Sequence, residues 1–193
     1  KVLAVHTAGF HSLDLRYQGF KMKLAQYPGI KIVGELPHTW ENILETTQSN
    51  VESFLTANPG GVDVIYAGWD VPVVGAAKAI TGLKLADKIK VIGIDAFVPV
   101  VEIMKKNGPI LSVVNQDPNY TGIIAGKAAL RFLEGNELPM LIVSPLETVR
   151  HNYPGYPSNL PKGFHYIKTV SEDLKAIGLT VGPEDPARAL VLD

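Results

Sequence analysis

The sequence predicts an α/β protein with a mostly parallel, doubly wound sheet, because short apolar runs alternate with helical patterns along the first 135 residues. The clearest unit lies between Gly61 and Ala96. Two runs rich in valine and isoleucine, Val62–Ala67 and Lys90–Ile94, flank a helical segment over Val71–Thr81. Neither run alternates with polar residues, as is typical of strands buried on both faces. We expect a right-handed crossover between two parallel strands here.

The other elements continue this alternation. Further strands are predicted over Val2–His6, Ile30–Leu36, Ile110–Val114 and Leu141–Val143, and further helices over 12–26, Asn42–Leu55, Val98–Lys106 and Pro118–Gly135. Three side chains precede helical patterns and are expected to cap them, namely Ser12, Asp70 and Asp117. The predicted fold is a three-layer sandwich with helices on both faces of a sheet in the order 2-1-3-4-5.

Composition excludes several classes of function. The net charge of −1 offers no broad basic surface, so we expect no nucleic-acid partner. No apolar run approaches the roughly 20 residues that cross a bilayer, so we expect no membrane insertion. The chain has no cysteine, which excludes disulfides, thiolate catalysis and cysteine-based zinc sites.

The sequence contains no recognised catalytic or phosphate-binding motif of the types GxSxG, HExxH, GxxxxGK[ST] or GxGxxG. His6, His11 and His38 are scattered over the first quarter of the chain, and their spacing signals no carboxylate partner for a metal site. We therefore expect no enzyme activity, no metal and no cofactor. Solvent-exposed or capping histidines are the simpler interpretation, although His6 and His11 are placed to touch a ligand.

Polar and aromatic side chains follow the predicted strands at their carboxyl ends, where ligands bind in open α/β sheets. The candidate ligand-binding residues are His11, Arg16, Trp69, Asp70, Asp95, Asn115 and Gln116. They provide hydrogen-bond donors and acceptors, one aromatic platform and no nucleophile–base pair, which suits holding a polyhydroxylated molecule. Simpler roles stay open for these residues. Capping a helix could be the whole role of Asp70 and of Asp95, Arg16 could be a solvated surface residue, and Trp69 could pack in the core.

Several segments resemble one family when they are taken together. They are LDLRYQGF at 13–20, AGWD at 67–70, VIGIDA at 91–96 and LSVVNQDPNYTGIIAGKAAL at 111–130. They look like type I periplasmic sugar-binding proteins of the ribose- and galactose-binding type, and the effector-binding cores of LacI-type repressors share the pattern. The resemblance covers about residues 1–145. In that family two α/β lobes, joined by three hinge strands, close on a sugar.

The resemblance implies roles for three of the candidates. The arginine of the family's R-x-x-GF motif falls on Arg16, the aspartate after its V-x-G-x-D strand on Asp95, and the glutamine before its hinge on Gln116. The chain departs from the family at Trp69-Asp70, where Asn-Asp is common. We therefore expect a ligand with a flatter face than a simple ribose.

The resemblance also implies a domain organisation. Residues 1–116 would be the C-terminal ligand-binding lobe, 117–146 the hinge and a return segment that packs on the N-terminal lobe, and 147–193 an irregular C-terminal extension. In the family the N-terminal lobe precedes the strand that is Val2–His6 here; if that lobe is absent, the return segment would have to dock elsewhere, swap between copies or be held by a partner chain. No signal peptide precedes the first strand, and we expect a cleaved, truncated or incomplete chain.

By this resemblance, the chain is the sugar- or polyol-binding component of an ABC transport system, with a membrane permease as partner and a periplasmic or extracytoplasmic location. The alternative is the effector-binding domain of a LacI-type transcription regulator, which would carry a helix-turn-helix upstream. A third hypothesis, an enzyme on a flavodoxin-like domain, is disfavoured by the absence of catalytic pairs.

Overall fold

The computed structural model describes residues 1–116, 118–137, 146–150 and 165–167. The chain divides into two compact units, which are considered separately below. The first comprises 1–114 with 149–165, and the second comprises 115–148 with 166–193. The sequence-predicted strand Leu141–Val143 and the predicted cap Asp117 lie outside the described residues.

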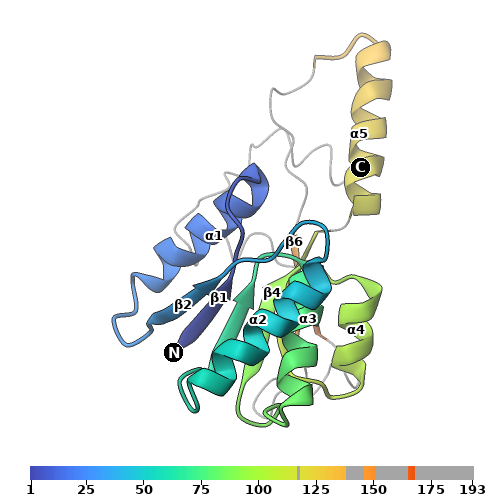
Figure 1. Ribbon diagram of the computed structural model, residues 1–193. Helices are drawn as coiled ribbons and strands as arrows, with labels where there is room; N and C mark the ends of the chain where they lie inside the picture. The colour runs from blue at the N-terminus through green and yellow to red at the C-terminus, as the bar shows by residue number, and fades with distance from the viewer. Residues whose placement is uncertain (117, 138–145, 151–164, 168–193) are drawn as a thin grey trace. The chain divides into compact units, whose positions relative to one another are not determined.

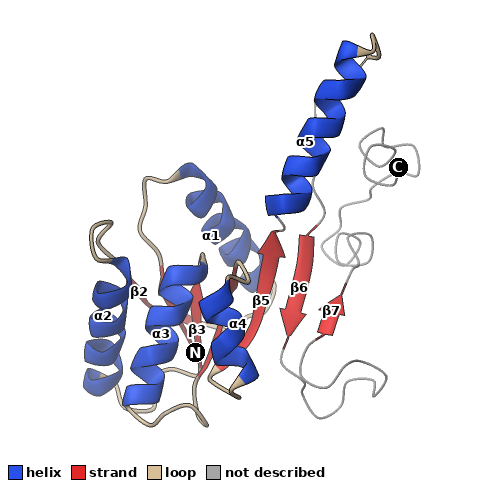
Figure 2. Ribbon diagram, turned by 90° about the vertical axis from the view of Figure 1, so that its right-hand side faces the viewer, coloured by secondary structure: helices blue, strands red, loops and turns tan. Residues whose placement is uncertain are grey.

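The sheet confirms the predicted fold class. Its strands are β1 (Val2–Val5), β2 (Ile32–Leu36), β3 (Val64–Ala67), β4 (Lys90–Ile94) and β5 (Ile110–Gln116). They pair in parallel in the order β2-β1-β3-β4-β5, as the sequence predicts (Figure 2). Their carboxyl ends therefore lie at one edge of the sheet, which is where the candidate ligand residues were expected.

Two short strands, β6 (Leu146–Arg150) and β7 (His165–Ile167), follow β5 in the strand order. They lie in the part of the chain that was expected to be irregular. The prediction gave weight to the prolines and glycines between them and overlooked the strand propensity of their valine, threonine, tyrosine and isoleucine residues.

The helices of the first unit lie on both faces of the sheet, as predicted (Figure 1). They are α1 (His11–Leu24), α2 (Ile43–Ala57), α3 (Asp70–Gly82) and α4 (Val98–Lys105). The α1 helix covers one face, and α2, α3 and α4 cover the other. The second unit contains α5 (Pro118–Leu133).

Strand β1 shows why the apolar runs do not alternate with polar residues. Leu3 and Val5 belong to the core cluster with α2, α3 and α4, whereas Val2 and Ala4 belong to the cluster under α1. All four side chains are at most 5% exposed. A central strand buried on both faces needs apolar residues at every position, which removes the period-two pattern of a half-exposed strand.

Gly93 in β4 marks a close approach between the sheet and α3. A Cβ atom at this position would overlap the Val73 side chain and lie 2.7 Å from the Ala67 carbonyl oxygen. The glycine in the segment VIGI is therefore required by packing.

The predicted caps Ser12 and Asp70 are wrong. Helix α1 begins at His11 with Phe10 as N-cap, and α3 begins at Asp70 with Trp69 as N-cap. Phe10 and Trp69 have extended backbones, and their carbonyl groups accept the first helical bonds from Asp14 and Val73. Neither cap makes a side-chain bond. Asp70 instead lies within the first turn, where the positive end of the helix dipole favours a carboxylate.

Candidate functional site

Arg16 and Asp95 form an ion pair across the carboxyl edge of the sheet. The Arg16 Nη1 atom donates to Asp95 Oδ2 at 3.1 Å and to the Gly68 carbonyl oxygen at 2.9 Å. The two side chains are only 17% and 29% exposed. Arg16 is therefore not a solvated surface residue. It joins α1 to the loop after β3 and to the end of β4.

Asp95 adopts a backbone conformation that is uncommon for a non-glycine residue, with φ at +71°. Its N–H donates to the Val114 carbonyl oxygen at 2.7 Å, which fixes the residue at the end of β4. Helix α4 has Phe97 as N-cap, so Asp95 does not cap it. Strained residues of this kind persist where the surrounding structure holds them, and they cluster at functional sites.

Trp69 and Asp70 lie in the turn between β3 and α3, next to the Gly68 carbonyl that Arg16 contacts. Both residues are half-buried. Burial raises the pKa of Asp70, and the negative charge of Asp95 adds to this effect, while bonds from backbone N–H groups and the charge of Arg16 oppose it. The structure thus brings four of the predicted residues together: Arg16, Trp69, Asp70 and Asp95.

An aromatic cluster lies at the same edge and is formed by Phe10, His38, Trp40 and Trp69. Ring-centroid distances are 5.8 Å for Phe10–Trp40, 5.1 Å for His38–Trp40, 6.0 Å for His38–Trp69 and 6.3 Å for Trp40–Trp69. Neither His38 nor Trp40 is among the candidate ligand-binding residues expected from the sequence, although both follow the carboxyl end of the predicted strand Ile30–Leu36. That position was the signal that could have found them.

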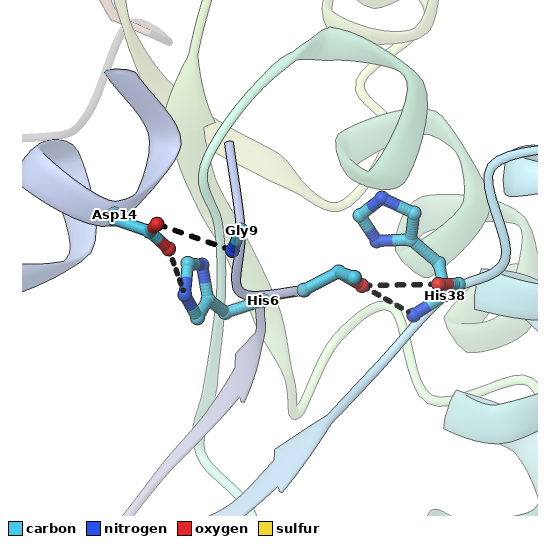
Figure 3. Close-up of polar contacts among 5 residues, drawn as sticks. His6, Gly9, Asp14 and His38 are labelled. Atoms are coloured by element: carbon cyan, nitrogen blue, oxygen red, sulfur yellow. Dashed lines mark hydrogen bonds and ion pairs between the residues drawn. The ribbon is translucent and has the colours of Figure 1, made fainter. Parts of the chain in front are cut away.

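Hydrogen bonds between the His38 backbone and Thr7 fix the position of His38. The Thr7 Oγ1 atom accepts a bond from the His38 N–H at 2.8 Å and donates to the His38 carbonyl oxygen at 3.0 Å. Figure 3 shows the His38 imidazole on the opposite side of the β1 end from the His6 imidazole, whose Nε2 lies 3.1 Å from Asp14 Oδ1. The second carboxylate oxygen of Asp14 accepts a bond from the Gly9 N–H.

The remaining predicted residues are not joined to this group. His11 is an exposed residue at the start of α1. Asn115 and Gln116 end β5 and belong to the second unit, so their predicted contact with the ligand stays a prediction. The described residues contain no group of three or more His, Asp or Glu side chains that could hold a metal ion. Within the same residues, no helix is long and apolar enough to cross a membrane.

Residues 1–137 match the family model described as the periplasmic binding protein domain. The chain belongs to this family. No curated protein sequence matches it. The family assignment confirms the resemblance found in the sequence, and it agrees with the observed sheet order.

Solved structures of transport proteins share the fold. An ABC sugar transporter subunit from Rhodobacter sphaeroides is 30% identical, with a TM-score of 0.70 over 77% of this chain. An ABC transporter periplasmic solute-binding protein from Actinobacillus succinogenes with bound D-allose is 28% identical, with a TM-score of 0.69 over 77% of this chain. A 5-methylthioribose transporter solute-binding protein from Thermotoga lettingae, in complex with 5-methylthioribose, is 25% identical, with a TM-score of 0.66 over 98% of this chain.

This chain spans about half the length of these proteins. It covers 55% of the Rhodobacter protein, 51% of the Actinobacillus protein and 58% of the Thermotoga protein. The match includes the part of the chain that carries Arg16 and Asp95, because the family model spans residues 1–137.

Proposed function

We propose that this chain is the ligand-binding C-terminal lobe of a solute-binding protein and that it holds a sugar or polyol at the carboxyl edge of its sheet. The observation that carries this proposal is the half-buried Arg16–Asp95 pair, which joins three elements at that edge. The solved structures named above are transport proteins, which favours this proposal over the LacI-type regulator.

The chemistry of the pair suits hydroxyl groups. An ionised carboxylate has about four lone-pair sites, and Arg16 occupies one oxygen of Asp95, so the second oxygen is available to accept from ligand hydroxyls. The guanidinium group has five N–H donors, of which the Nη1 group makes the bonds described above. Trp69 offers an aromatic face on which the apolar face of a sugar ring stacks. These groups bind and orient a ligand and do not transform it.

The whole protein would act by hinge closure of two lobes over the ligand. In that arrangement the segment 117–146 packs on an N-terminal lobe, Asn115 and Gln116 reach the ligand from the hinge, and a membrane permease receives the ligand in the periplasm. A single lobe makes only part of the contacts, so we expect this chain alone to bind weakly.

Binding can be tested by calorimetry and thermal shift with D-allose, D-arabinose, allitol and 5-methylthioribose. The decisive variant is Asp95→Asn, since asparagine tolerates positive φ and keeps the side-chain shape while the charge is removed. We expect affinity to fall by roughly 10- to 100-fold, because a hydrogen bond to a charged group contributes about 1.5–3 kcal/mol. Arg16→Met should have a similar effect.

A matched control is Asp87→Asn, which removes an exposed carboxylate that precedes β4, at the opposite edge of the sheet. It should leave affinity unchanged. The proposal is wrong if the wild-type chain, at millimolar sugar, shows neither heat nor a thermal shift with any compound. It is also wrong if Asp95→Asn binds as tightly as Asp87→Asn.

A further inference from the structure

His38 is a buried polar residue whose imidazole has no hydrogen-bond partner among the described residues. It is 5% exposed, and within the part of the chain that the structure describes neither Nδ1 nor Nε2 makes a hydrogen bond. Burying unpaired polar atoms is unfavourable, and such groups are rare in native proteins. The position therefore calls for an explanation other than the stability of the fold.

The His38 imidazole lies against both tryptophans of the site. It meets the Trp40 ring nearly edge-on, with an interplanar angle of 78°, and the Trp69 ring at 53°. The two indoles are 6.3 Å apart at a mutual angle of 30°. Both indole rings thus contact the same imidazole, so the orientation of each indole depends on the position of the His38 ring.

The backbone holds His38 in place from two sides. Thr7, just after β1, bonds to the N–H and to the carbonyl group of His38. The next residue, Thr39, donates its N–H to Thr46 Oγ1 of α2 at 3.2 Å. The ring is therefore attached to the sheet and to α2 through a short loop, and only side-chain rotation remains free.

The surroundings of the ring favour its neutral form. Burial lowers the pKa of His38, and the charge of His6 lowers it further. The His6 imidazole lies on the other side of the β1 end, and its own partner is Asp14. On the side of α3 the contact is Trp69, with Asp70 next in the chain, and the loop of His38 carries Glu41. None of the ion pairs found among the described residues involves His38.

We propose that His38 is a positioning residue that orients Trp40 and Trp69 for the ligand while its imidazole is neutral, so that acidification weakens ligand binding through His38. This inference rests on the proposed function for its effect on affinity. A protonated imidazole would leave its buried place for water, because no carboxylate compensates it there. Both indoles would then lose the ring that supports them.

The two tryptophans of the chain are both in this cluster, so tryptophan emission reports on it without a ligand. The wild-type chain should show a transition between pH 8 and pH 5 with a midpoint below the ordinary histidine value of about 6.5. His38→Phe keeps an aromatic ring that cannot be protonated, and it should abolish the transition. His38→Ala should abolish it too and should shift the emission already at pH 8.

Affinity for D-allose or 5-methylthioribose, whichever the wild-type chain binds, supplies the second measurement. His38→Phe should bind within about threefold of wild type at pH 8 and should lose less affinity than wild type at pH 5.5. His38→Ala should bind at least tenfold more weakly at pH 8. Equal affinity of His38→Ala and wild type, or the same loss at pH 5.5 in His38→Phe and wild type, would overturn the inference.

The two proposals fail in different ways. If no sugar binds but the emission transition disappears in His38→Phe, the proposed function is wrong and the positioning of the indoles stands. If sugars bind and the transition persists in His38→Phe, the positioning role is wrong and the binding function stands. Should both variants fail to fold, the histidine ring signals of the wild-type chain decide by NMR: the His38 midpoint must coincide with the midpoint of the emission change, and a mismatch rejects the inference.

Discussion

The two faces of the sheet are packed with different kinds of side chain. Under α2, α3 and α4 the core is almost entirely aliphatic, with Leu3, Ile65, Ile80 and Ile110 fully buried. Under α1 the cluster is smaller and aromatic. Its rings include Tyr17, Phe20 and Tyr66.

The aromatic face also carries ionisable side chains, whereas the buried polar residue that α2 places on the aliphatic face is the uncharged Thr47. His6 stacks on Tyr17 at 4.5 Å between ring centroids, and Arg16 extends from the same helix to Gly68 and Asp95. The hydroxyl of Tyr66 is buried and makes no hydrogen bond to any residue that the structure describes. Helices α2, α3 and α4 thus supply most of the buried apolar surface of the described residues, and α1 brings the charge of Arg16 to the site.

The largest effect is expected on the aliphatic face from Gly93→Ala. The new methyl group would overlap Val73 and lie 2.7 Å from the Ala67 carbonyl oxygen, so the strand and helix would have to separate. We expect a loss of about 3 kcal/mol in the free energy of unfolding, measured by urea denaturation. The control is Gly19→Ala on α1, where a Cβ meets nothing within 4 Å; it should stabilise the helix by about 0.5–1 kcal/mol.

The second-largest loss of stability is expected from a substitution on the aromatic face. The Phe20 and Tyr66 rings stack with centroids 3.9 Å apart at an angle of 9°. Phe20→Leu keeps most of the apolar volume and removes this ring pair, so we expect a loss of about 1.5 kcal/mol in the same denaturation experiment. A loss as large as that of Gly93→Ala would mean that the two faces contribute more equally than the packing indicates.

Tyr66→Phe should change stability in the opposite direction. Burial raises the pKa of Tyr66 to about 12, although the charge of Arg16 lowers it, and the hydroxyl has no partner among the described residues. Removing that hydroxyl should raise the free energy of unfolding by about 1 kcal/mol, since an unpaired buried polar atom is lost. A lower melting temperature than wild type would show that the hydroxyl has a stabilising partner, such as an ordered water molecule.

The smallest effect is expected at the site edge from Asp70→Asn. Burial raises the pKa of Asp70 above its ordinary value of 3.8, so the folded state holds this proton more tightly than the unfolded state. Stability therefore falls as the pH rises through the ordinary and then the raised pKa. Asp70→Asn should gain about 0.5 kcal/mol or less at pH 7, because solvent screens a half-exposed carboxylate, and the gain should shrink as the pH approaches 3.8. Thermal unfolding of the wild type and Asp70→Asn at pH 7 and pH 4 measures the gain in stability with Asp70 mostly charged and partly protonated. A gain that grows on acidification would contradict a raised pKa of Asp70.

The sequence predicted most of the fold because the signals that it used are local. The run Lys90–Ile94 has the same bounds as β4, and Pro118 stands at the start of both the predicted helix Pro118–Gly135 and α5. Helix starts were less certain, since they depend on which carbonyl accepts the first bond. Extended backbone at Phe10 and Trp69 moved two starts by one residue, and no local pattern signals that choice.

The site was predicted in part. Arg16, Trp69, Asp70 and Asp95 were found because they follow strand ends or match a family motif, and the structure brings them together. His38 and Trp40 follow the predicted strand Ile30–Leu36, but they were not among the candidate ligand-binding residues. Their importance lies in ring contacts with Trp69, which is about thirty residues further along the chain.

The alternation of strands and helices, the parallel sheet and the edge at which the candidate residues gather follow from the sequence alone, because hydrophobic periodicity and strand-end chemistry are properties of neighbouring residues. Three features came from the tertiary structure: the pairing of Arg16 with Asp95, the strained conformation of Asp95, and the His38 ring, which lies against two indoles without a hydrogen bond to any described residue. These features arise from contacts between residues far apart in sequence, whose distances are set when the sheet and its helices pack together.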